Sequence, residues 1–434
     1  MEFKYQLDER PPFAETVLFA LQWFLVVVPF IIILGTIAAG IHYPDSPVLQ
    51  LKYLQKVFLA TGVTLLVQVL GGHRLPIIVG PAAVLLSGLV ANQGDATSGA
   101  AYFSVAVCGL LITVLSSLGL LSRISVLFTP RVVGIVLLLI AFTILPTILN
   151  LILDGVSNPF GQLMFAIAMI MALMAGQRFL PDALKSTIVI WALILGSLAY
   201  YGLIAGALPR SQIVSQAAAD GGLMAVTLSF DPVVVISFLF CFFALTANDL
   251  GSIQSTANLL GVRDVEKRTN AGLIVTGLGN ILAGCLGVIG PVNYSLSSGV
   301  IIASGCASRF PVGTAALGMI LLAFTPGIIS IFSYIPAVVT GSLLFYTMCS
   351  QVAGGLMMLG KSFEASGMET GLLMGFSLML GTLVAFLPSQ VVADIPPLIR
   401  PLLTNGFVVG VTAALILEHL VYGKGGGSNY AKTD

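Results

Sequence analysis

The chain has 434 residues, of which 57% are hydrophobic and only 8% charged, and its formal net charge is zero. Soluble domains carry about 25% charged residues, so this composition excludes a water-exposed surface over most of the protein. The zero net charge and the lack of a basic run argue against a nucleic-acid partner. The sequence therefore predicts a polytopic membrane protein whose surface is largely covered by lipid.

Fourteen apolar segments follow one another along the chain, and several are near or below the ~20 residues that cross a bilayer as one helix. They lie at about 15–40, 53–71, 75–91, 99–121, 131–151, 159–177, 185–207, 233–258, 270–288, 290–306, 311–332, 336–358, 367–388 and 398–422. The shortest are the third and the tenth, and both contain Gly-Pro. We expect an all-α membrane protein of 14 transmembrane segments, with the third and tenth short and broken into a strand and a half-helix.

The distribution of Lys and Arg tests this segment count, because cytoplasmic loops carry an excess of both. With a cytoplasmic N-terminus and alternating loops, fourteen of these residues fall on the cytoplasmic side. Four fall on the other side, namely Lys52, Lys56, Arg210 and Arg400. We therefore expect a multi-pass protein of the plasma (inner) membrane with both termini in the cytoplasm.

An internal repeat is indicated by the two broken segments. Residues 80–87 and 290–297 both fit G-P-x-x-x-x-L-S, at the third position of each group of seven segments. Because seven is odd, the second group enters the membrane with inverted orientation. We expect a cytoplasmic N-terminus (1–14), a first inverted repeat (15–207), an inter-repeat loop (208–232), a second repeat (233–422) and a flexible cytoplasmic tail (423–434).

The Gly-Pro breaks predict the position of a binding site. Proline interrupts a helix, and the freed backbone groups must be buried or line a cavity. Broken segments at matching places in two halves are the sequence signal for a transporter's midplane site. The alternative is a kink that only shapes packing. Candidate solute contacts in these segments are Ala83, Asn293, Tyr294, Ser295 and Ser297.

The eighth segment contains an acid near its middle, Asp249, beside Asn248 and three residues before Ser252. An acid at bilayer depth costs about 2.5–3.5 kcal/mol on insertion scales and is by default a functional-site hypothesis. We expect Asp249 to bind a coupling proton or cation, and Asn248 and Ser252 to contact the solute. The alternative is an acid that caps a broken helix or pairs with a basic residue. The pair His73-Arg74, before the third segment, indicates an interface anchor.

Several short motifs together resemble one transporter family. They are Tyr5-x-Leu7-Asp8-x-x-Pro11-Pro12 with Gln22, Arg74-Leu75-Pro76 before Gly80-Pro81, Phe128-x-Pro130-x-Val132-Val133-Gly134, Leu250-Gly251 with Thr256-Ala257-Asn258, Gly279-Asn280 through Gly299-Val300, and Ile335-Pro336. They resemble the nucleobase–cation symporters, also called the nucleobase–ascorbate or xanthine/uracil permease family. The resemblance implies a 7+7 inverted repeat with a core domain (segments 1–4 and 8–11) and a gate domain (5–7 and 12–14). It also implies proton- or sodium-coupled uptake of purines or pyrimidines by a homodimer.

The ligand-binding positions depart from the family pattern. Where members usually hold the base with a Glu, three residues before the glycine of the eighth segment, this chain has Asn248, and the following polar position is Ser252. The tenth-segment positions correspond to Leu296, Ser297 and Gly299, and the stacking aromatic of the third segment corresponds to Ala83. Backbone groups at Ala83 and Ser295 remain candidate contacts. The scaffold is thus matched while the substrate and the coupling ion stay open.

The sequence therefore predicts a secondary transporter of a nucleobase-like solute that works by alternating access, with a small-molecule substrate and the bilayer as its partners. One alternative is transport of a small organic or inorganic anion on the same fold, although the third, eighth and tenth segments hold no basic residue. Another is a non-transporting membrane receptor. We expect no enzyme, because no Ser-His-Asp triad, phosphate loop or HExxH pattern is visible, and no metal site or cofactor beyond a coupling ion.

Overall fold

The computed structural model describes residues 3–91, 98–120, 129–153, 158–181, 188–205, 228–396 and 399–422. The first half of the chain forms α1 (Phe13–His42), α2 (Pro47–Leu70), β1 (Val79–Pro81), α3 (Ala83–Ala91), α4 (Ser98–Ser117), α6 (Pro130–Thr143), α7 (Leu145–Leu153), α8 (Pro159–Phe179), α10 (Ile188–Tyr200) and the π-helix η2 (Tyr201–Ala205). The second half forms α12 (Pro232–Leu259), α13 (Val265–Leu286), β2 (Pro291–Asn293), α14 (Ser297–Ser304), α15 (Phe310–Ala323), α16 (Pro326–Ile329), η3 (Ser330–Tyr334), α17 (Ala337–Ala385), α18 (Ser389–Asp394), α19 (Arg400–Leu403), α20 (Gly406–Ile416) and η4 (Leu417–Val421). Phe128, most of the predicted inter-repeat loop (208–227) and the predicted tail (423–434) lie outside the described residues.

The predicted fourteen segments correspond to elements of this structure. In the described residues, nine helical stretches are long and apolar enough to cross a membrane, and α15 with α16 and η3 adds a pair bent by 92°. Two shorter apolar helices, Ile188–Ile204 and Gly406–Val421, and the two strand-plus-half-helix units complete the set. Segments 12 and 13 correspond to the spans Ala337–Gly360 and Gly367–Ala385, which both lie in the 49-residue element α17. No proline interrupts residues 337–385, so nothing in the sequence removes a helical hydrogen bond there.

Four of the long helices begin in the same way. A side-chain oxygen accepts a hydrogen bond from a first-turn N–H, and a proline follows at the first helical position; the capping residues are Ser46, Thr129, Asn158 and Asp231. The cap satisfies an otherwise unpaired donor, and proline is suited to the first turn because its missing N–H would have no partner there. These helix starts are therefore encoded locally.

The two Gly-Pro motifs form a single small sheet. Strands β1 and β2 pair antiparallel, with Val79 opposite Asn293 and Pro81 opposite Pro291. Each strand leads into a half-helix, β1 into α3 and β2 into α14. Equivalent positions of the two repeats thus meet in the protein interior, where every residue of both strands is buried. The predicted strand and half-helix are confirmed for both broken segments.

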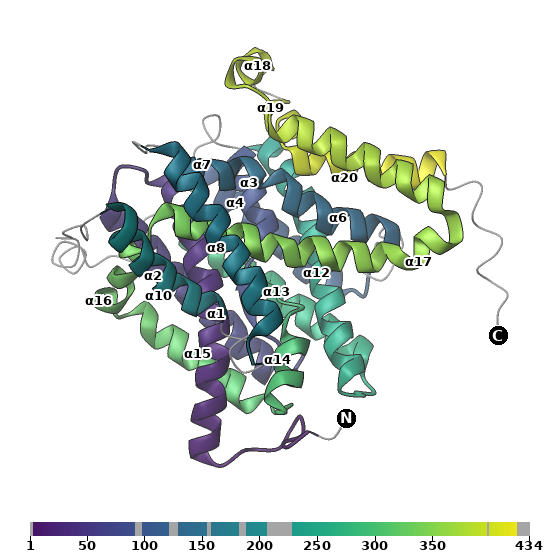
Figure 1. Cartoon of the computed structure of the whole chain (residues 1–434). Helices are drawn as coiled ribbons and strands as arrows, with labels where there is room; N and C mark the ends of the chain where they lie inside the picture. The colour runs from purple at the N-terminus through teal and green to yellow at the C-terminus, as the bar shows by residue number, and fades with distance from the viewer. Residues whose placement is uncertain are drawn as a thin grey trace.

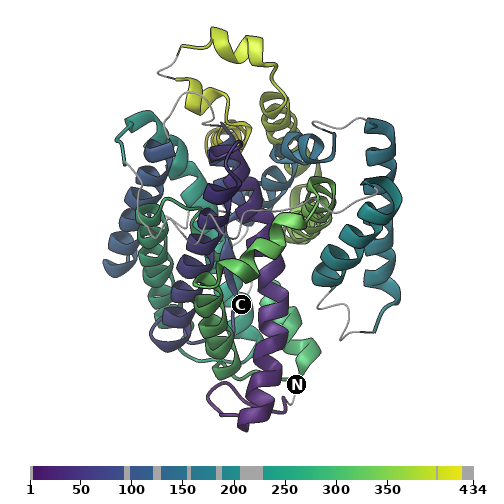
Figure 2. The same cartoon turned by 90° about the vertical axis from the view of Figure 1, so that its left-hand side faces the viewer.

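The helices pack as two groups. The core group consists of α1, α2, α4, α12, α13 and α15, which pack around β1–α3 and β2–α14. The gate group consists of α6, α7, α8, α10, α17 and α20. Figure 1 shows α17 and α20 running across the molecule beside α6, and in Figure 2 the blue-green pair α8 and α10 stands to one side of the bundle. This division is the one that the family resemblance implies.

Glycines allow the closest helix contact in the core group, between α4 and α13. A Cβ built on Gly277 would lie 2.6 Å from the carbonyl oxygen of Gly109, and one on Gly284 would lie 2.6 Å from that of Tyr102. Small residues at such crossings let two backbones approach in a membrane.

In the gate group, Glu418 of η4 accepts a 2.8 Å hydrogen bond from the Thr129 hydroxyl and lies 3.6 Å from Arg131, which ties η4 to the start of α6.

Candidate functional site

A cavity of about 920 Å³ lies between the core group and the gate group. Its core side consists of α1, the junction of β1 with α3, α12 and the junction of β2 with α14, and its gate side is mainly α17. Among the described residues that line it, none carries a charge, and most are apolar. Such a mostly apolar cavity with a few polar groups is typical of a small-molecule site.

Two half-helices begin at the cavity wall. Ala83 is the first residue of α3, and Ser295 lies two residues before α14; both line the cavity. The N–H groups of a first helical turn have no partner inside the helix, and the N-terminus carries a partial positive charge. The cavity therefore presents hydrogen-bond donors and a positive potential from the backbone, without a basic side chain.

Tyr294 forms an aromatic wall beside these helix starts. Its ring contacts Phe30 of α1 edge to face, with centroids 5.3 Å apart, and both residues line the cavity. The Tyr294 hydroxyl donates to the carbonyl oxygen of Pro81 at 2.7 Å and so joins the two repeats. Because Gly80 has no Cβ, the ring can lie directly over it; an added Cβ would be 2.5 Å from the ring. The aromatic face is thus held in place beside the cavity.

Asn248 is the polar side chain of α12 that reaches the cavity. Its Nδ2 donates to the carbonyl oxygen of Asn293 at 3.1 Å, which fixes the amide orientation and leaves Oδ1 as an acceptor. The hydroxyl of Ser252, one turn later, shares its single proton between the Asn248 carbonyl oxygen at 2.8 Å and the same Asn293 carbonyl oxygen at 3.1 Å. The serine therefore stabilises the strand and the helix and does not line the cavity.

Asp249, the next residue of α12, points away from the cavity. It is fully buried, and its Oδ1 accepts a 2.7 Å hydrogen bond from the backbone N–H of Asn293. Its Oδ2 has no hydrogen-bond partner among the described residues. The side chains of Thr276 and Asn293 approach the carboxyl. Asp249 thus binds the back of β2, and it pairs with no basic residue of the described chain.

Asn293 is the centre of a buried polar network. Its Oδ1 lies 3.1 Å from His73 Nε2, and its Nδ2 donates to the Thr276 hydroxyl at 3.3 Å. The Leu75 N–H donates to His73 Nδ1 at 2.9 Å, so the ring is the neutral tautomer with the proton on Nε2. Gln68 of α2 also donates to Thr276, at 3.1 Å. All four polar atoms of Asn293 are therefore occupied, and none faces the cavity.

The role expected for His73 at the membrane interface is not what the structure shows. The histidine lies in the connection between α2 and β1, outside the spanning helices, and it is 0% exposed. Burial lowers the pKa of His73 to about 4, in agreement with a neutral ring. Arg268 of α13 donates to the His73 carbonyl oxygen at 3.0 Å. Sequence reasoning missed this residue, together with Thr276 and Gln68; the one available signal was a glutamine inside an apolar helix.

The predicted solute contacts separate into two sets. Ala83, Asn248, Tyr294 and Ser295 line the cavity. The other three residues are buried behind the cavity wall, and their hydrogen bonds join neighbouring segments of the core group. They are Ser252, Asn293 and Ser297. Ser297, for example, accepts from the Ile78 N–H at 3.0 Å and donates to the Tyr294 carbonyl at 2.6 Å. Strand alternation explains the position of Asn293, because successive side chains point to opposite faces and its neighbours Val292 and Tyr294 line the cavity.

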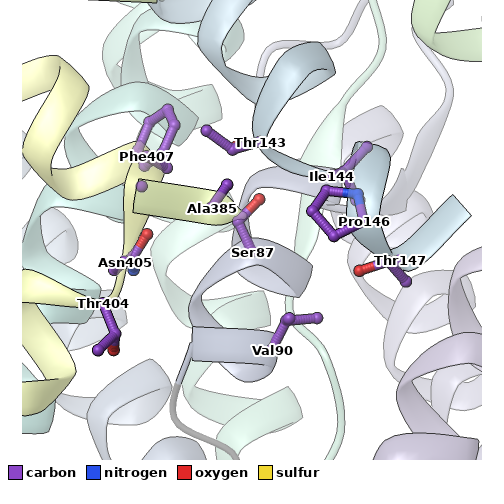
Figure 3. Close-up of a pocket in the computed structure, with 11 residues that line it drawn as sticks. Ser87, Val90, Thr143, Ile144, Pro146, Thr147, Ala385, Thr404, Asn405 and Phe407 are labelled. Atoms are coloured by element: carbon purple, nitrogen blue, oxygen red, sulfur yellow. The ribbon is translucent and has the colours of Figure 1, made fainter. Parts of the chain in front are cut away.

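The two ends of α3 border spaces of very different size. At its first turn lies the large cavity, whereas Ser87 and Val90 near its other end border a pocket of only about 50 Å³. Figure 3 shows these two side chains facing Thr143 and Thr147 of the gate group, with Phe407 closing another side. A purine cannot fit there. The gate and core groups are thus closed together at one end of α3 and apart at the other.

Comparison with known proteins agrees with this architecture. Residues 14–390 match the profile of a family described as the permease family, named for xanthine and uracil. The chain is 25% identical to the nucleobase transporter PlUacP of Paenibacillus larvae, over 86% of this chain and 87% of that one, and 25% identical to the xanthine permease of Bacillus subtilis, over 86% of each. Among solved structures, the transmembrane domain of the cyanobacterial bicarbonate transporter BicA has a TM-score of 0.59 at 17% identity, covering 88% of this chain and 98% of that one. Murine Slc26a9, an anion transporter in the inward-facing state, also has a TM-score of 0.59, at 13% identity, covering 94% and 69%. The fold is the 7+7 repeat of these transporters.

Proposed function

Because this chain belongs to the xanthine/uracil permease family, we propose that it is a secondary active transporter that moves a neutral, nucleobase-like purine or pyrimidine across the membrane. The observation that carries the proposal is the uncharged cavity between core and gate, onto which two half-helix N-termini and one fixed amide converge. A heterocyclic base offers carbonyl and ring-nitrogen acceptors to the helix starts and N–H donors to Asn248 Oδ1. Its apolar faces suit the ring of Tyr294.

The position of the cavity supports an inward-facing state. Gln177, near the C-terminal end of α8, and Ile188, at the start of α10, both line it. In the topology expected from the Lys and Arg distribution, those helix ends are cytoplasmic, and the narrow pocket at Ser87 lies on the outer side. Alternating access would then close the cytoplasmic cavity and open the contact around Ser87. Cytoplasmic termini, a location in the plasma membrane and a homodimer belong to the same proposal.

Coupling to a proton or a sodium ion is assigned to Asp249 in this proposal. The carboxyl is fully buried and one of its oxygens has no partner among the described residues. A charged group at this depth is costly, so binding a cation at the free oxygen stabilises the site. Ion binding at Asp249 would then couple uphill uptake of the cargo to the ion gradient.

The test is uptake of radiolabelled xanthine, uracil and adenine into proteoliposomes with an imposed proton or sodium gradient. Saturable uptake of one of them that unlabelled base abolishes is the expected result. Bicarbonate and sulfate serve as controls for anion transport. Saturable uptake of an anion with no uptake of any base would refute the cargo assignment and leave the fold untouched.

A further inference from the structure

Resting on the transport function proposed above, we infer that two neighbouring residues of α12 divide the work of the site: Asn248 contacts the cargo, and Asp249 responds to the coupling ion and acts on the cavity only through strand β2. Asp249 is then a positioning residue. In this arrangement no single side chain contacts both the cargo and the coupling ion.

The geometry of a helix separates the two side chains. Consecutive residues of an α-helix are about 100° apart around its axis, because 3.6 residues complete a turn. Asn248 is partly exposed and lines the cavity, whereas the Asp249 side chain is 0% exposed and is absent from the cavity wall. Strand β2 separates them further, since Val292 and Tyr294 line the cavity and Asn293 points the opposite way. Cargo in the cavity therefore meets Asn248 and not Asp249.

Both side chains nevertheless hold the same strand residue. Asn248 Nδ2 donates to the Asn293 carbonyl oxygen at 3.1 Å, and Asp249 Oδ1 accepts from the Asn293 N–H at 2.7 Å. An N–H bound to an ionised carboxylate makes a stronger hydrogen bond than one bound to a neutral acceptor. The charge of Asp249 thus sets how firmly β2 is held against α12, one residue away from the cavity wall at Tyr294.

The unpartnered oxygen of Asp249 is where an ion can act. Binding of a proton or a cation at Oδ2 leaves the hydrogen bond from the Asn293 N–H to Oδ1 in place, because Oδ2 itself accepts no hydrogen bond among the described residues. The neutralised carboxyl then holds the Asn293 N–H more weakly, and β2 gains freedom to move with Tyr294 and Ser295. The ion comes from the aqueous phase and leaves to it, so no other reactant is needed.

Few other charged or titratable groups face this carboxyl. On the opposite side of Asn293 lies His73, which is neutral and reaches Asp249 only through the asparagine. Arg268 of α13 binds the backbone carbonyls of His73 and Arg74 and not the acid. No other charged side chain of the described residues contributes to the field at Asp249. A pH or sodium response at this site is therefore assigned to Asp249 itself.

The experiment compares Asp249→Asn with Asn248→Ala in proteoliposomes, with radiolabelled xanthine, uracil and adenine as probes and uptake measured from pH 5.5 to 8 with and without sodium. For Asp249→Asn we expect the dependence on pH or sodium to disappear and KM to stay near the value that the wild type has when its ion site is saturated. For Asn248→Ala we expect KM to rise about tenfold, the effect of losing one hydrogen bond, with the ion dependence kept. A rise in KM for Asp249→Asn as large as that for Asn248→Ala would overturn the inference.

A cargo-free measurement keeps the inference testable if either variant folds poorly. Ser295→Cys, on a background without other cysteines, reports movement of the segment after β2 through its rate of reaction with a soluble maleimide. We expect this rate to change with pH or sodium in the presence of Asp249 and to become constant with Asp249→Asn. A rate that is constant in both proteins overturns the inference alone. Failure of the wild type to take up any base overturns the proposed function and the inference together.

Discussion

Replacing Asn293 by alanine tests the buried network that holds β2. The side chain bonds to two buried partners, His73 Nε2 at 3.1 Å and the Thr276 hydroxyl at 3.3 Å. Thr276 keeps its hydrogen bond from Gln68, but the Nε2–H of His73 loses the only acceptor that the described structure gives it. A buried unsatisfied donor costs about 1–3 kcal/mol, and the space left by the amide adds about 1 kcal/mol.

We therefore expect Asn293→Ala to lower the free energy of unfolding by about 2–4 kcal/mol. The measurement is thermal unfolding of the purified protein in detergent, calibrated by denaturant unfolding where that is reversible. The matched control is Ser295→Ala, two residues away, because Ser295 is exposed to the cavity and a change at such a position is within about 0.5 kcal/mol. A loss below about 1 kcal/mol for Asn293→Ala would mean that His73 finds another acceptor, such as water, and that the network does not hold the strand.

Three further changes test packing, accessibility and the gate group. Gly284→Ala should destabilise the protein by about 1–3 kcal/mol, because the new Cβ would lie 2.6 Å from a carbonyl oxygen of α4. The control Gly299→Ala should leave stability unchanged, because nothing lies within 4 Å of its Cβ. Equal effects of the two changes in thermal unfolding would contradict the close contact of α4 with α13. Ser295→Cys should react with a soluble maleimide much faster than Ser297→Cys, since only the first side chain is exposed; similar labelling rates would place the cavity elsewhere. Glu418→Gln should lower stability by about 1–2 kcal/mol because it removes the charge that joins η4 to α6, and an unchanged unfolding midpoint would show that this ion pair contributes nothing.

Much of the architecture was predictable from local physics. An apolar fraction of 57% with 8% charged residues requires lipid on the outside, whatever the fold. Gly80-Pro81 and Gly290-Pro291 had to interrupt their segments, because proline removes a helical hydrogen bond wherever it stands inside a helix. Matching breaks at the third and tenth segments then implied two halves that meet at one place. The structure confirms this in the pairing of Pro81 with Pro291.

The functional residues were only partly predictable. Ala83, Asn248, Tyr294 and Ser295 line the cavity, since each lies at a helix start or on the helix that faces it, and their contact with a solute stays a prediction. The roles of Asp249 and Asn248 as ion site and cargo contact remain predictions. Their separation by β2 could not be deduced from sequence, because the rotation of α12 about its axis depends on what packs against it.

The membrane environment, the number of segments and the two broken segments follow from the amino-acid sequence, because composition, hydrophobic length and proline act locally or over the whole chain. Which polar groups contact one another depends on the packing of distant elements. His73 and Asn293 are 220 residues apart in the chain, yet their side chains lie 3.1 Å apart. Asp249 likewise binds a strand 44 residues away. The first contact depends on how the two repeats pack on each other, and the second on how α12 and β2 pack within the second repeat; neither follows from the residues next to it in the chain.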